Sequence, residues 1–182
     1  SLLPPIVANV FNCRNLKWVD HPPLYLDNSG RRLKMRRVVV ANDHGAVEVA
    51  NKVVEHLKAR GFEVDHLGVY TNDSVDYPDK AAEACKKFLG GGYEFGVLAC
   101  GTGIGISISA NKINGIICAL PQNTFAAEMA KCHNNANFIA FGGRIEYCDP
   151  VEEMLDAFID HDFEGGRHAK RVDKIMALES QI

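Results

Sequence analysis

From residue 36 onward, short apolar runs alternate with longer amphipathic segments. The expected strands are short and rich in apolar residues, and they lie at residues 36–41, 62–68, 94–100, 115–120 and 137–143. The expected helices lie at residues 47–61, 77–92, 106–113, 124–135, 150–163 and 167–182. Strands separated by helix-length segments form βαβ units. The alternation therefore predicts an α/β protein, a Rossmann-like sandwich with a five-stranded parallel sheet flanked by helices.

The domain organisation follows from the length and from where this alternation begins. A chain of 182 residues fits one compact domain. Residues 1–35 contain four prolines and the turn-like segment PPLYLDNSGRR, and they lack the strand–helix rhythm. We therefore expect residues 1–35 to be an N-terminal extension of unknown role, and residues 36–182 to form the single folded domain.

The composition argues against several classes of partner. The formal net charge of -3 provides no basic field of the kind that attracts nucleic acid. No apolar run approaches the roughly 20 residues that a membrane helix needs, and no secretory signal opens the chain. The six cysteines form no C-x-x-C pair, which disfavours a zinc finger or a thioredoxin-type site. We expect a cytoplasmic protein with reduced thiols and without nucleic-acid or membrane partners.

Polar and glycine-rich segments follow three of the expected strands. In a doubly wound parallel sheet, ligands bind beyond the carboxyl ends of the strands. Asp43 and His44 follow the first strand, the segment CGTGIG follows the third, and the segment GGR, which ends at Arg144, follows the fifth. These three segments are therefore expected to form a binding site, although a histidine at such a place also occurs as a simple partner of a loop carbonyl.

The most informative segment is LACGTGIGISISANK, residues 98–112. Its three alternate glycines follow a strand and lead into a helix, so the backbone can approach a ligand and free N–H groups attract negative charge. The same position favours the thiolate form of Cys100. A thiolate beside N–H donors suits the removal of a proton α to a carbonyl, while the donors hold the enediolate oxygen. The hydroxyl of Thr102 is expected within reach of the same oxygens.

Two alternatives to this interpretation stay open on spacing alone. Free cysteine is usually a small buried hydrophobe, and that is our interpretation of Cys85, Cys118 and Cys132. Glycine-rich turns between a strand and a helix also bind dinucleotides. Here the spacing is G-x-G-x-G rather than G-x-G-x-x-G, the turn follows the third strand, and no acidic residue ends the next strand.

Basic residues in the C-terminal part of the chain are further candidates for catalysis and for phosphate binding. His133, at the end of the fourth expected helix, could act as a general acid or base near neutral pH, although the helix dipole alone also favours a histidine there. Arg167 and Arg171 are four residues apart and share a helical face. Guanidinium groups bind phosphate through a planar fork, and a solvated basic face is the alternative.

Together these segments resemble the type B ribose-5-phosphate isomerase family, which also includes galactose-6-phosphate isomerase subunits. The resemblance runs from about residue 36 to the C-terminal helix. The matching motifs, in order, are NDHG, SVDYPD, CGTGIGISISANK, CHNNAN, FGGR and GGRHAKR. One branch of this family carries a cysteine at position 100 and another a glycine there with a glutamate at position 106, so this chain, with Cys100 and Ile106, resembles the cysteine branch.

The resemblance implies a sugar-phosphate isomerase domain that interconverts ribose 5-phosphate and ribulose 5-phosphate in the pentose phosphate pathway, without metal or cofactor. It implies that His133 opens the furanose ring, that Cys100 moves a proton between C2 and C1, and that Thr102 helps to move one between O1 and O2. The implied sugar-binding residues are Asp43, His44, Tyr77, Gly101, Gly103, Ile104, Gly105 and Asn134. The implied phosphate-binding residues are Arg144, Arg167, His168 and Arg171.

The resemblance also implies a homodimer, or a dimer of dimers, with active sites shared across the interface and His133 reaching the partner's site. Members of the family often read HND where this chain reads HNN, so Asn135 argues against a carboxylate role at that position. Two other functions remain as alternatives. One is the isomerisation of a hexose 6-phosphate of the allose or galactose type. The other is a sugar-phosphate-binding module without catalysis, against which the intact Cys100, Thr102 and His133 argue.

Overall fold

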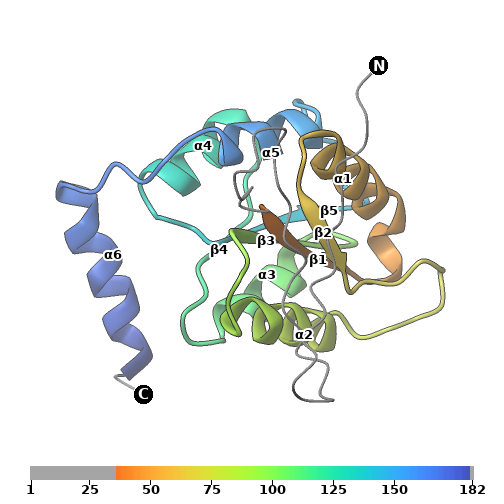
Figure 1. Ribbon diagram of the computed structural model, residues 1–182. Coiled ribbons are helices and arrows are strands. Elements are labelled where there is room, and N and C mark those ends of the chain that lie inside the picture. Colours follow the sequence, from red (N-terminus) through yellow and green to blue (C-terminus); the bar gives the residue numbers. More distant parts are fainter. Residues whose placement is uncertain (1–35, 181–182) are drawn as a thin grey trace, which may run out of the picture. The chain divides into compact units, whose positions relative to one another are not determined.

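The computed structural model describes residues 36–180, which form one parallel β-sheet with helices on both faces (Figure 1). The strands are β1 (Arg37–Asn42), β2 (Glu63–His66), β3 (Phe95–Cys100), β4 (Cys118–Ala119) and β5 (Phe138–Gly142). They lie in the order β2-β1-β3-β5-β4, and every neighbouring pair is parallel. The predicted five-stranded α/β fold is confirmed, whereas the predicted extension at residues 1–35 lies outside the described residues.

The helices lie between and after the strands. They are α1 (Val47–Ala59), α2 (Tyr77–Leu89), α3 (Ile104–Asn111), α4 (Thr124–Cys132), α5 (Val151–Ile159) and α6 (Arg167–Ala177), with short 3-10 segments at His44–Ala46 and Leu178–Ser180. Across residues 36–180, no helix combines the length and the apolar character that a membrane span requires.

The two faces of the sheet bury separate apolar clusters, because side chains alternate along each strand. On one face, Val38 and Val40 belong to a cluster with residues of α1, α4 and α5. On the other face, Val39 and Ala41 belong to a cluster with residues of α2 and α3 (Figure 1). Cys100, the last residue of β3, belongs to this second cluster. The loop that follows Cys100 therefore starts from a rigid, buried strand end.

The strand order places a topological switch point between β1 and β3. The chain continues from β1 to β2 on one side of the sheet, and from β3 to β4 and β5 on the other. At such a point the loops after the two central strands diverge and leave a crevice at the carboxyl edge. The polar segment after β1 and the glycine loop after β3 both lie at this edge.

Strand β4 is shorter than the sequence predicted. Only Cys118–Ala119 pair with β5, whereas the apolar run covers residues 115–120. Side-chain amides bind the backbone at the start of this segment: Asn111 Oδ1 accepts from the N–H of Cys118 at 2.8 Å, and Asn137 Oδ1 accepts from the N–H of Ile117 at 2.9 Å. Because the amides satisfy these backbone donors, the segment stays attached to the sheet without extending the strand.

Candidate active site

The segment after β1 forms the first wall of the site. Asp43 is buried, and its Oδ1 accepts a hydrogen bond from the N–H of Gly45 at 2.8 Å, so the carboxylate fixes the turn that leads into α1. His44 Nδ1 accepts from the N–H of Val75 at 3.2 Å. This bond ties the turn to the segment that precedes α2, where Tyr77 begins the helix.

The glycine loop after β3 forms the second wall. Cys100 Sγ accepts a hydrogen bond from the N–H of Gly103 at 3.2 Å, and the residue is 3% exposed. Thr102 Oγ1 accepts from the N–H of Ile104 at 3.3 Å. Gly103 caps α3 with φ 74°, in the left-handed region. The sulfur therefore lies beside backbone donors at the start of a helix, an arrangement that favours negative charge.

The segment after β5 and the start of α2 contact this loop. The carbonyl oxygens of Cys100 and Gly101 accept from the N–H groups of Gly143 and Arg144 at 2.8 and 2.9 Å. The Arg144 side chain packs over Gly101, because a Cβ at Gly101 would lie 3.6 Å from Arg144 Cδ. On the other side, a Cβ at Gly105 would lie 2.5 Å from Tyr77 Cζ. The predicted residues of the three segments are therefore brought together.

Replacing Gly103 by alanine is expected to reduce both stability and activity. A Cβ there would lie 2.6 Å from Leu120 Cδ1 and 2.8 Å from the Phe141 carbonyl carbon, and the residue would keep φ +74°. Left-handed backbone and overpacking each cost about 1–3 kcal/mol, so the free energy of unfolding measured with urea should fall by roughly 2–4 kcal/mol. Gly61→Ala is the matched control, with φ +84° and nothing within 4 Å. Equal losses in both variants would contradict the close packing at Gly103.

A second group of predicted residues lies around the C-terminal end of α4. His133 caps α4, and its ring stacks on the ring of His168 of α6, with centroids 3.9 Å apart and planes 9° apart. Glu164 Oε2 lies 3.7 Å from Nε2 of each ring. Arg167 Nε donates to His168 Nε2 at 3.4 Å. Burial, with His133 and Arg167 nearby, lowers the pKa of His168 from its ordinary value, which favours a neutral ring.

The turn after His133 explains why the chain has an asparagine at position 135. Asn135 is the one described non-glycine residue with positive φ, at 48°, and its N–H donates to the Lys131 carbonyl at 3.1 Å. Asparagine tolerates this conformation better than most residues. Asn134, beside it, is exposed. Asn135 therefore has a backbone role in ending α4.

His133, Glu164 and His168 place one ligand-type atom each within 4.8 Å of one another, but the arrangement does not fit a metal ion. The two rings are nearly parallel, so their in-plane lone pairs cannot converge on one ion. The Arg167 N–H also occupies the His168 nitrogen that would bind it. The three groups therefore form a cluster of two stacked rings and one nearby carboxylate.

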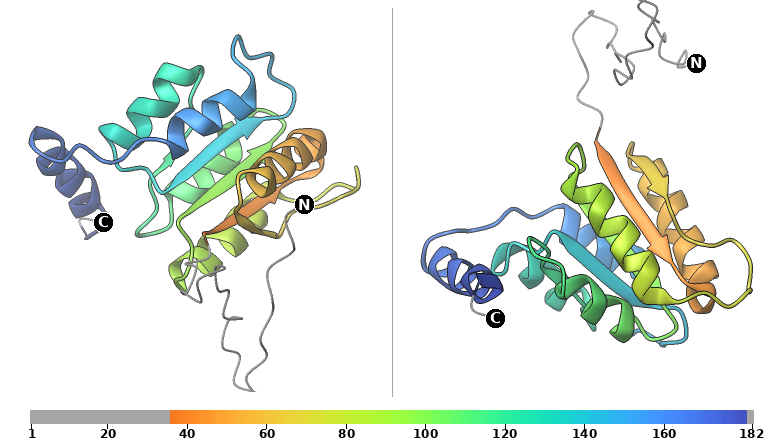
Figure 2. Two further views of the ribbon diagram at one scale, coloured as in Figure 1. Left: turned by 45° about the horizontal axis from the view of Figure 1, so that its top comes forward. Right: turned by 90° about the horizontal axis from the view of Figure 1, so that it is seen from below.

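The two groups of site residues lie at opposite ends of β5. Cys100 pairs with Gly142 at the carboxyl end of β5, whereas His133 precedes Phe138 at its amino end. Four steps along a strand span about 13 Å. Figure 2 shows α6, which carries His168, on the side of the sheet where β5 begins. One chain therefore does not bring Cys100 and His133 together.

Sequence reasoning missed Asn42, the fully buried first residue of the NDHG motif. Its Nδ2 donates to the carbonyl oxygens of Asp43 and Val69 at 2.9 and 3.0 Å, and its Oδ1 lies 2.6 Å from His66 Nε2. Burial lowers the pKa of His66, so a neutral ring donates to Asn42. Asn42 thus joins the ends of β1 and β2 behind Asp43. Its only signal in the sequence was its place beside Asp43.

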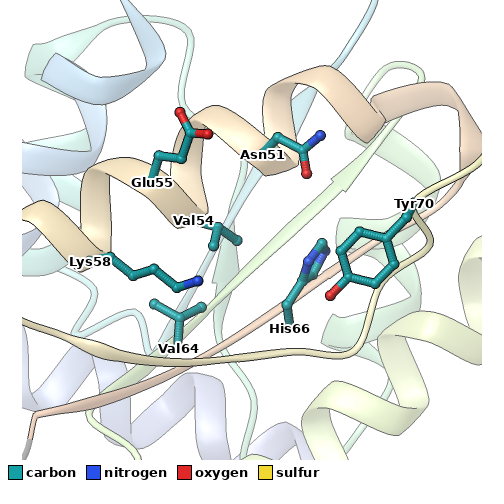
Figure 3. Close-up of a pocket in the computed structure, with 7 residues that line it drawn as sticks. All are labelled: Asn51, Val54, Glu55, Lys58, Val64, His66 and Tyr70. Atoms are coloured by element: carbon teal, nitrogen blue, oxygen red, sulfur yellow. The ribbon is translucent and has the colours of Figure 1, made fainter.

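A surface pocket of about 330 Å³ lies next to this pair and does not belong to the predicted site. It is lined by Asn51, Val54, Glu55, Lys58, Val64, His66 and Tyr70 (Figure 3). Four of these residues lie on α1, so the pocket opens at the β2 edge of the sheet.

Fold and site together define an α/β protein with a cysteine-bearing glycine loop at its topological switch point. The sequence model of the Ribose/Galactose Isomerase family matches residues 38–175. The chain belongs to this family, which confirms the resemblance noted in the sequence.

Relatives match over nearly their whole length. Ribose-5-phosphate isomerase B of Escherichia coli is 35% identical over 147 residues, which cover 81% of this chain and 99% of that protein. The putative sugar phosphate isomerase YwlF of Bacillus subtilis is 39% identical, over 80% of this chain and 98% of that protein. Among solved structures, ribose-5-phosphate isomerase B of Clostridium thermocellum matches with a TM-score of 0.77 and 39% identity, covering 80% of this chain and 98% of that one.

Proposed function

We propose that the chain is an aldose–ketose isomerase that interconverts ribose 5-phosphate and ribulose 5-phosphate, as in the pentose phosphate pathway. The observation that carries this proposal is Cys100 Sγ, held at 3.2 Å from the Gly103 N–H at the start of α3. Relatives of 35% identity that this chain covers almost completely are named ribose-5-phosphate isomerase B. The five described cysteines are free, which fits a reducing compartment such as the cytoplasm.

In this mechanism the Cys100 thiolate takes the proton from C2 of the open-chain aldose. The C–H electron pair forms the C1=C2 bond, and negative charge moves to O1. N–H groups of the loop from Gly101 to Gly105 stabilise this enediolate, and Thr102 helps a proton pass from O2 to O1. The thiol then returns its proton to C1, which leaves a ketone at C2. Asp43, His44 and Tyr77 border the sugar.

The second group of residues supplies ring opening and phosphate contacts. His133 opens the furanose ring and Asn134 contacts the sugar. Arg167, His168 and Arg171 bind the phosphate together with Arg144 of the first group, because guanidinium forks match its oxygens. Arg171 lies one turn after Arg167 on α6, which supports a common phosphate site at the start of this helix.

Arg171→Ala is expected to raise KM for ribose 5-phosphate about tenfold while kcat changes by less than about twofold, because one charge-assisted contact to the phosphate is lost. Steady-state kinetics measures both constants. Lys174→Ala, also exposed and also on α6, is the matched control and should leave KM unchanged. An unchanged KM in Arg171→Ala would remove Arg171 from the phosphate site.

We further propose a homodimer in which each site combines Cys100 of one chain with His133 of the other. The separation of these residues along β5 supports this arrangement. Apolar side chains around the glycine loop are exposed in the single chain: Ile104 and Ile108 lie one turn apart on α3, and Leu120 and Ile145 lie next to the loop. A second copy that covers them would bury apolar surface and deliver the missing group.

The experiment that tests the activity is a coupled assay of ribose 5-phosphate conversion by the pure, reduced protein, with a chelator present. Conversion is expected. Absence of conversion would overturn the proposed substrate. A relative of 36% identity is named D-erythrulose-4-phosphate isomerase, so four-carbon sugar phosphates, followed by hexose 6-phosphates, would be the next substrates to measure.

A further inference from the structure

Glu164 lies just outside the GGRHAKR motif and has no role in the mechanism above. Its backbone N–H donates to the Cys132 carbonyl at 3.0 Å, which fixes Glu164 beside the end of α4. Gly165 and Gly166 then turn the chain with φ 64° and 55° into α6. The result is a single carboxylate oxygen, Glu164 Oε2, at 3.7 Å from Nε2 of both His133 and His168.

The surroundings of the two rings indicate whether the Glu164 carboxylate pairs with His133 or with His168. His168 is the more buried ring, with its side chain 7% exposed, and its Nε2 accepts from Arg167. An accepting nitrogen carries no proton, so it offers Glu164 no positive charge. His133 is 34% exposed, and within the described residues Glu164 is the only acidic side chain paired with it. The geometry therefore assigns Glu164 to His133, since Arg167 already donates to the Nε2 atom of His168.

We propose that Glu164 is a positioning residue that orients His133 and balances its charge while the ring of the sugar opens. The inference rests on the proposed function. His133 Nε2 takes the proton from the O1 hydroxyl as the C1=O1 bond forms and the C1–O4 bond breaks. The same nitrogen then gives that proton to O4. Both oxygens are bonded to C1, so one nitrogen reaches both, and the imidazolium between the two transfers faces Glu164.

The test compares a reaction that needs ring opening with one that does not. Ribose 5-phosphate is a furanose in solution, whereas ribulose 5-phosphate stays open because its O5 carries the phosphate. Glu164→Gln is expected to lower kcat for ribose 5-phosphate about tenfold, with little change in KM. The reason is that the imidazolium of His133 loses the negative charge beside it. Deuterium exchange at C1 of ribulose 5-phosphate, measured by NMR in D₂O, should stay within about twofold of wild type, because it needs only the enediolate step.

Glu128→Gln is the matched control, because Glu128 forms a similar pair with a different histidine, His161, at 3.5 Å. It should leave both rates unchanged. An unchanged kcat in Glu164→Gln would overturn the proposal. A raised KM with unchanged kcat, or an equal loss in both reactions, would also overturn it and assign Glu164 a structural role in the phosphate site. A wild-type activity that a chelator removes would assign the cluster to a metal instead.

The failure of this inference can be told apart from the failure of the proposed function. Wild-type protein that does not convert ribose 5-phosphate overturns the function itself. Wild-type protein that converts it, beside an equally active Glu164→Gln variant, overturns only the role of Glu164.

Discussion

A Cys100→Ala variant is expected to fold like the wild type and to lose turnover of ribose 5-phosphate by at least about 10³-fold, because the reaction loses its acid/base. The sulfur is the group proposed to move the proton between C2 and C1, and the Gly103 N–H faces it. Its removal leaves a small cavity that should cost only about 1 kcal/mol, so urea unfolding should detect little change. The coupled assay and the unfolding curve separate the two effects.

Cys85→Ala is the matched control for this variant. Cys85 belongs to the same apolar cluster and is fully buried, so its replacement removes a similar volume. Burial raises the pKa of the Cys85 thiol to about 12, so this thiol stays protonated near neutral pH and is chemically inert. Full activity in Cys85→Ala with none in Cys100→Ala would assign the base to Cys100. Full activity in Cys100→Ala would move the base elsewhere.

Mixing two inactive variants is expected to restore activity. If each site combines Cys100 of one chain with His133 of the other, a mixed dimer of Cys100→Ala and His133→Ala keeps one of its two sites intact. After unfolding and refolding an equal mixture, half of the dimers are mixed, so roughly a quarter of wild-type activity should return. Each variant refolded alone should stay inactive.

The control mixture pairs Cys100→Ala with Thr102→Ala. Both changes affect the same half of the site, so no mixed dimer has an intact site, and activity should not exceed that of Thr102→Ala alone. Mixed dimers of Cys100→Ala and His133→Ala, isolated through two different tags and found inactive, would contradict a shared site. Sedimentation of the wild type as a monomer would contradict it as well.

Much of the fold could be predicted because it depends on local patterns. Runs such as Val38–Val40 alternate between the two faces of a sheet, and amphipathic stretches such as Val47–Ala59 present one apolar stripe. These periodicities reflect how side chains project from a strand or a helix, so neighbouring residues carry them. The glycine loop could be predicted for the same reason, because the pattern that identifies it lies within six consecutive residues.

Element boundaries depended on contacts that local patterns do not contain. Helix α3 begins at Ile104, two residues earlier than predicted, because Gly103 in the left-handed region starts the helix directly after the turn. Strand β4 has only two residues, and Asn111, seven residues away, binds the backbone of the first of them. Asn42 looked like a loop residue, yet it is buried and joins two strand ends through three polar contacts.

The sequence by itself determined the class of fold, the family and the chemical types in the site, because periodicity and short motifs are properties of consecutive residues. Only the tertiary structure decided which of these residues meet. It placed Cys100 and His133 at opposite ends of β5, and it brought Glu164 to two histidines that lie 31 and 4 residues away. The physical reason is that residues at the amino and carboxyl ends of parallel strands are separated by the full length of a strand. A short sequence motif contains no information about this distance.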